Sequence, residues 1–122
     1  MTRSNCRYES DFCEGVLEFR LLGEIDHHSA VNMRTAMDAE ICELRPKKVI
    51  IELCGIDFMD SSGLGLIMGR YALVQKMGGI LSLRSPNERI LKILELAGLM
   101  RIIGIETEKK TDKAKEKEDE RK

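Results

Sequence analysis

The sequence predicts a single α/β domain in which helices pack on a mostly parallel, mixed β-sheet that starts with an antiparallel hairpin. Two segments rich in β-forming residues, 6–13 and 16–22, are separated only by Glu14-Gly15, which is typical of a hairpin. Apolar strands and amphipathic helices then alternate up to residue 105, and helices between strands imply parallel pairing. The 122 residues suffice for one domain and leave no room for a second.

The first helix is expected from about His27 to Leu44, with Asp26 placed to cap it. Gly23 is expected to end the second hairpin strand before that cap. Apolar residues spaced by three or four define the predicted buried stripe of this helix: Ala30, Met33, Met37, Ile41 and Leu44.

The apolar run Val49 to Leu53 predicts a central strand that is covered on both faces. A loop over 54–60 and a helix from about Ser61 to Met77 follow. In this helix one stripe should face the sheet, namely Leu64, Ile67, Met68 and Tyr71. A neighbouring stripe of small residues allows close approach of either the chain's own elements or a partner: Ser62, Gly65, Gly69 and Ala72.

The last elements of the domain are a strand at 80–83, a helix that Pro86 opens and Gly98 ends, and a short strand at 101–105. The composition then changes abruptly, because residues 106–122 contain seven acidic and seven basic residues and only one apolar residue. The sequence therefore predicts a domain over 1–105 and a disordered charged tail over 106–122.

The charge balance excludes several classes of function. Basic residues number 20 and acidic residues 21, so the chain lacks the basic surface expected of a protein that binds nucleic acid or acidic lipid. No apolar stretch approaches the roughly 20 residues of a membrane span and no signal peptide opens the chain, so we expect a cytoplasmic protein without membrane contact. Cys6, Cys13, Cys42 and Cys54 lack paired-ligand spacing, which predicts buried free thiols and no metal site.

The segment DFMDSSGLG at 57–65 is the best candidate functional site, because it lies where a buried strand passes into a helix. The first backbone N–H groups of a helix lack intrahelical partners and its dipole is positive there. Asp60 or Ser61 can cap this helix, and the hydroxyls of Ser61 and Ser62 lie on its first turn. The simplest interpretation is a cap and a tight turn without chemistry.

Two catalytic or ligand-binding interpretations of this segment are weak. Gly63, Gly65 and Gly69 form GxGxxxG rather than the GxGxxG of dinucleotide-binding folds. A nucleophile elbow needs glycine two residues before the serine, and this sequence has none there. The only candidate bases, His27 and His28, are adjacent at a helix start and diverge by about 100°.

A third interpretation is a regulatory phosphoacceptor. A serine on an exposed first turn is accessible to a kinase, and phosphorylation adds a charge of about −1.5 to −2 and three acceptor oxygens. The helix dipole tolerates this charge, so the fold should survive, whereas a partner docked on the turn would be repelled. The switch would then act on an interface.

Two motifs together resemble the STAS-domain anti-sigma factor antagonists, and in particular the sporulation type that acts through the sigma-F anti-sigma factor. They are GEIDHHSA at 23–30 and MDSSGLGLIMGR at 59–70, and the resemblance runs from about Gly15 to Ile105. It implies a STAS domain without catalytic activity or cofactor that works by partner exchange, and we expect the free chain to be a monomer.

In the family, the unmodified antagonist binds an anti-sigma factor that is also a serine kinase, and the sigma factor is released. The kinase phosphorylates the antagonist, and a PP2C-type phosphatase restores it. By position, the resemblance makes Ser61 the phosphoacceptor and implies a partner-binding surface formed by Asp26, Asp60, Ser61, Ser62, Gly63 and Gly65. The alternatives are a STAS scaffold subunit of a stress-signalling complex and a small nucleotide-binding domain.

Overall fold

The computed structural model describes residues 6–106 and confirms the predicted α/β class. Its elements are, in chain order, β1 (Cys6–Cys13), β2 (Val16–Ile25), α1 (His27–Leu44), β3 (Lys48–Met59), α2 (Ser61–Lys76), β4 (Ile80–Arg84), α3 (Glu88–Leu96), the 3-10 helix η1 (Leu99–Arg101) and β5 (Gly104–Glu106). The strands form one sheet in the order β1-β2-β3-β4-β5. The β1–β2 pair is antiparallel and every other pair is parallel, as the sequence predicted.

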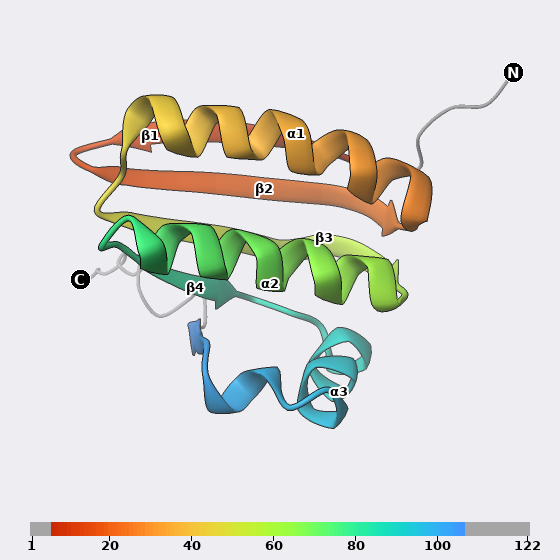
Figure 1. Ribbon diagram of the computed structural model, residues 1–122. Coiled ribbons are helices and arrows are strands. Elements are labelled where there is room, and N and C mark those ends of the chain that lie inside the picture. The colour runs from red at the N-terminus through yellow and green to blue at the C-terminus, as the bar shows by residue number, and fades with distance from the viewer. Residues whose placement is uncertain (1–5, 107–122) are drawn as a thin grey trace, which may run out of the picture.

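Helices α1 and α2 lie side by side on one face of the sheet, and both begin at the same end of it (Figure 1). Four of the five predicted α1 core residues are buried beneath that helix, and Leu44 at its end is partly buried. The ring of Phe19 on β2 is fully buried and meets Tyr8 of β1 edge to face, with ring centroids 5.3 Å apart. The core therefore lies between this helix layer and the sheet.

Strand β2 does not end at Gly23 as predicted. The strand continues to Ile25, and register shifts occur on either side of Gly23, whose φ of +105° suits a glycine. The glycine therefore accommodates an irregularity within the strand rather than a stop. The added residues carry the chain directly to Asp26 at the start of α1.

Strand β3 is also longer than predicted, because the expected loop over 54–60 is almost entirely strand. Its extension pairs with β2, with Leu22 opposite Gly55 and Ile25 opposite Met59. Glycine and aspartate are poor strand formers, so local composition indicated a loop, whereas the hydrogen bonds to β2 decide the conformation. As a result β2 and β3 end at the same level of the sheet.

The buried face of α2 differs in part from the predicted stripe. Ile67 is buried as predicted, but Leu64, Met68 and Tyr71 are only partly buried. The other buried residues of the helix are Gly63, Leu66, Arg70 and Val74. The burial of Arg70 in particular could not be predicted from a hydrophobic pattern, because such a pattern places arginine toward solvent.

Arg70 is buried because it forms an ion pair between the two helices. Its Nε lies 2.7 Å from Asp38 Oδ1 of α1, and its Nη2 donates to Asp38 Oδ2 at 3.4 Å. Burial lowers the pKa of the guanidinium, and the Asp38 carboxylate opposes that shift. This pair fixes α1 and α2 relative to each other.

The start of α3 lies two residues later than predicted. Pro86 precedes the helix, and Asn87 is its N-cap, with Oδ1 accepting the Ile90 N–H at 2.8 Å. The Asn87 side chain also donates to the Ile56 carbonyl at 3.2 Å, which ties the start of α3 to β3. Gly98 follows the helix in the left-handed conformation, as its position predicted.

The last strand begins at Gly104, because 99–101 form the 3-10 helix instead of the expected strand start. Glu106, which the sequence assigned to the charged tail, lies in β5 and pairs with Arg84 of β4. Its carboxylate accepts hydrogen bonds from Lys48 Nζ at 2.8 Å and Ser82 Oγ at 2.9 Å. The rest of the predicted tail, 107–122, lies outside the described residues.

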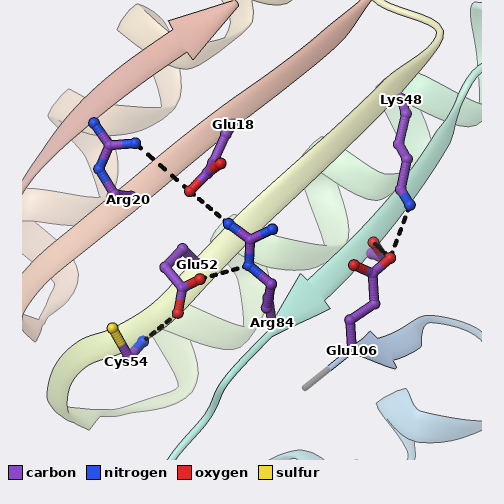
Figure 2. Close-up of polar contacts among 8 residues, drawn as sticks. Glu18, Arg20, Lys48, Glu52, Cys54, Arg84 and Glu106 are labelled. Atoms are coloured by element: carbon purple, nitrogen blue, oxygen red, sulfur yellow. Dashed lines mark hydrogen bonds and ion pairs between the residues drawn. The ribbon is translucent and has the colours of Figure 1, made fainter. Parts of the chain in front are cut away.

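A charged cluster links the strands on the sheet face opposite α1 and α2 (Figure 2). Arg84 of β4 lies 2.6 Å from carboxylate oxygens of both Glu52 on β3 and Glu18 on β2. Burial alone would lower the Arg84 pKa, but hydrogen bonds to the two carboxylates raise it above its usual value. Glu52 is 5% exposed and also accepts the Cys54 backbone N–H. The cluster joins three neighbouring strands.

All four cysteines are free thiols, as predicted, but only Cys6 is buried. Burial raises the pKa of the Cys6 thiol to about 11. Cys13, Cys42 and Cys54 are exposed, so the prediction of buried thiols was wrong for these three. Apolar neighbours in the sequence placed them in buried segments, whereas each lies on the solvent side of its element.

Candidate functional site

The two sequence motifs meet at one edge of the sheet. Ile25 and Met59 are paired at the ends of the parallel strands β2 and β3, so Asp26 and Asp60 both follow paired residues. The Asp60 N–H donates to the Ile25 carbonyl at 3.3 Å. The structure therefore places the N-termini of α1 and α2 next to each other at the carboxyl end of the strands, where α/β sheets commonly bind their ligands.

Asp26 caps α1 as the sequence predicted. Its Oδ1 accepts the Ser29 N–H at 2.9 Å and the Ser29 hydroxyl at 2.7 Å, while its own N–H donates to Ser29 Oγ at 3.3 Å. This reciprocal arrangement is a capping box. Ser29 is fully buried, so the box fixes the start of the helix against the core.

Asp60 is the cap of α2, which decides between the two candidates that the sequence offered. Its Oδ1 accepts the Ser62 N–H at 2.8 Å, and its carbonyl accepts the Gly63 N–H at 2.9 Å. Ser61 is consequently the first residue of the helix.

The structure distinguishes the two serine hydroxyls. Ser61 is exposed, and its hydroxyl has no hydrogen-bond partner within residues 6–106. Ser62 is half-buried and lines a groove between the two helices. The Ser61 hydroxyl is therefore accessible at the positive end of a helix.

The two glycines of the motif have different surroundings. Gly63 is buried, and a Cβ added there would lie 2.8 Å from Met59 Cβ and 3.3 Å from Ile25 Cγ2. Gly65 is exposed, and a Cβ added there would meet no atom within 4 Å. Gly63 thus serves the packing of α2 on the strands, whereas the fold itself does not require Gly65.

The groove beside Ser62 has a volume of about 230 Å³. Besides Ser62, Gly65 and Leu66 of α2, it is lined by the α1 residues His27, Ala30, Val31 and Arg34. Sequence reasoning missed Val31 and Arg34, although their helical spacing from His27 could have shown that they share one face of the helix.

Two other kinds of feature are absent from the described part of the chain. Within residues 6–106 no group of three histidine, cysteine or acidic side chains is placed to hold a metal ion. Among the helices that the structure describes, none has both the length and the apolar character needed to cross a membrane.

Comparison with known proteins agrees with the resemblance that the two motifs indicated. The STAS domain family model matches residues 8–114. The chain belongs to the STAS domain family. The anti-sigma F factor antagonist of Paenibacillus polymyxa is 38% identical over 101 residues, which cover 83% of this chain and 86% of the relative. The anti-sigma-B factor antagonist of Bacillus subtilis is 32% identical over 94 residues, covering 75% and 83% respectively.

Solved structures show the same fold. Unphosphorylated SpoIIAA, an anti-sigma factor antagonist, superposes with a TM-score of 0.73 at 27% identity over 84% of this STAS chain and 90% of SpoIIAA. Phosphorylated SpoIIAA, a Bacillus cell fate determinant, gives a TM-score of 0.67 at 27% identity, over 84% of this chain and 93% of the SpoIIAA chain. The family and the fold expected from the sequence are therefore both confirmed.

Proposed function

We propose that this STAS chain antagonises an anti-sigma factor through the Ser61 turn, and that phosphorylation of Ser61 switches the contact off. The observation that carries the proposal is the exposed Ser61 hydroxyl on the first turn of α2, directly after the Asp60 cap. Relatives named anti-sigma factor antagonists, and a structural neighbour described in both phosphorylated and unphosphorylated forms, support it.

The geometry explains why a phosphoryl group here would act on a partner rather than on the fold. The Ser61 side chain points away from the core, and the sheet and the capping hydrogen bonds hold the backbone of the turn. The positive end of α2 tolerates a charge of about −1.5 to −2. A protein seated on the turn would meet that charge at contact distance and would lose affinity.

The contact surface that we propose contains Asp26, Asp60, Ser61, Ser62 and Gly65. Gly63 is left out, because it is buried against Met59. The proposed partners are an anti-sigma factor with serine kinase activity and a PP2C-type phosphatase, and the chain itself acts as a cytoplasmic regulator rather than an enzyme.

Phosphosite mapping tests the proposal. The purified chain is incubated with the anti-sigma kinase of the same organism and ATP, and labelled peptides are identified by mass spectrometry. We expect the label on Ser61, its loss in Ser61→Ala and its retention in the matched control Ser62→Ala. Label confined to residues outside 60–65 would contradict the proposal.

A further inference from the structure

A groove opens beside the Ser61 turn between the N-terminal halves of α1 and α2, which lie side by side in Figure 1. Ala30, Val31 and Arg34 form its α1 wall, and Ser62 and Gly65 belong to its α2 wall. Val31 is 39% exposed although it is a large apolar residue. The groove therefore offers apolar surface continuous with the proposed contact turn.

The α2 wall is smoother than the fold needs. Gly65 and Gly69 are one turn apart, and a Cβ at either position would meet nothing within 4 Å. Glycine is unfavourable inside a helix. The contacts of the described residues do not explain why glycine rather than a larger residue occupies these two positions. Of the two explanations that the sequence left open, this favours close approach by another molecule.

Arg34 gives the groove an uncompensated positive charge. It is exposed, lines the groove and makes no ion pair within residues 6–106. The nearby carboxylate of Asp38 is already committed to Arg70, which is 5% exposed. No acidic residue lines the groove itself. Its charge thus suits a carboxylate rather than a cation.

Charge also changes sign between the groove and the capped helix starts next to it. The carboxylates of Asp26 and Asp60 cap the two helices, and Asp60 lies two residues before Ser62, which lines the groove. Arg34 lies eight residues, or about two helical turns, further along α1 from Asp26. A segment that enters from the turn and carries its acidic side chain toward the Arg34 end matches this pattern.

We propose that the groove receives an acidic segment of the anti-sigma factor, with a carboxylate paired to Arg34 and apolar atoms lying over Val31 and Gly65. The inference rests on the function proposed above and specifies the chemistry of the partner. It also gives the proposed phosphorylation switch a direct target, because a phosphoryl group on Ser61, the neighbour of the groove residue Ser62, repels the same acidic segment.

Calorimetric titration against the anti-sigma factor of the same organism tests the groove. We expect Arg34→Glu to weaken binding by at least about tenfold and Arg34→Gln by about threefold, since charge reversal adds repulsion to the lost attraction. Gly65→Leu tests shape instead of charge and should also weaken binding about tenfold, because its side chain fills the groove. Arg45→Glu, at the opposite end of α1, is the matched control and should bind within about twofold of wild type.

The outcomes separate the groove from the proposed function. Binding of Arg34→Glu as tight as that of wild type, or an equal loss in Arg45→Glu, overturns the groove proposal while the Ser61 switch stands. A wild-type chain that does not bind the factor, or that binds equally with and without phosphate, overturns the proposed function. Thermal unfolding of each variant shows that it is folded, which is expected because Arg34, Arg45 and Gly65 are exposed.

Discussion

The contrast between Gly63 and Gly65 makes a sharp prediction about stability. The two glycines lie two positions apart in the same helix and both lack a side chain, but only Gly63 faces the core. We therefore compare Gly63→Ala with Gly65→Ala. The second variant is the control for any general effect of alanine in this helix.

The magnitudes follow from the space available at each position. The new Cβ of Gly63→Ala would lie 2.8 Å from Met59 Cβ and 2.9 Å from Met59 Sδ, so the packing must shift. Overpacking of this kind costs about 1–3 kcal/mol, against a helix-propensity gain of up to about 1 kcal/mol. Gly65→Ala receives the propensity gain without a collision, so the two variants should differ by about 2 kcal/mol in unfolding free energy.

Urea and thermal unfolding followed by circular dichroism measure this difference. For a domain of this size about 2 kcal/mol corresponds to a separation of roughly 8–16 °C in Tm, with Gly65→Ala the more stable variant. Equal loss of stability in both variants would refute the reasoning, because it would mean that another part of the chain fills the space in front of Gly65.

Three further predictions concern the charged cluster of the sheet, the Asp26 cap and the Glu106 carboxylate. Arg84→Met should destabilise the chain by about 3 kcal/mol in urea unfolding, because it leaves the buried Glu52 carboxylate unpaired. Arg20→Met, which removes a 40% exposed partner, should cost less than about 1 kcal/mol, and equal losses would contradict the role given to burial. Asp26→Ala should cost about 1 kcal/mol through the lost cap, and a fall in anti-sigma factor affinity beyond that loss would show that Asp26 also shapes the contact. Burial alone would raise the pKa of Glu106, but hydrogen bonds from Lys48 and Ser82 lower it below its usual value. The ionised Glu106 carboxylate therefore stabilises the fold above the unfolded carboxyl pKa of about 4.3, and this stabilisation is lost as pH falls through the folded pKa. Glu106→Gln should therefore lose less stability than wild type between about pH 6 and pH 3, and identical pH profiles would contradict this assignment.

Local sequence patterns were sufficient to predict the bounds of those elements that are set by residues close to them in the sequence. The β1 and α1 boundaries match the prediction at both ends, because a two-residue turn and an aspartate cap are signals within a few residues of sequence. The position of Ser61 on the first turn of α2 was predictable for the same reason.

Features that depend on distant partners could not be read locally. The second half of β3 is strand because β2 pairs with it, and Arg70 is buried because Asp38 lies on the facing helix. The groove around Arg34 exists only once α1 and α2 are placed side by side. Sequence reasoning therefore found the phosphoacceptor candidate but not the α1 wall of the groove next to it.

The hydrogen bond from the Asp60 N–H to the Ile25 carbonyl has a consequence for the speed of the proposed switch. It ties the turn that carries Ser61 to the end of strand β2, so we expect the proposed addition or removal of a phosphoryl group there to require no slow rearrangement of the backbone. The cycle time would then be set by the turnover of the modifying enzymes and by dissociation of the bound protein.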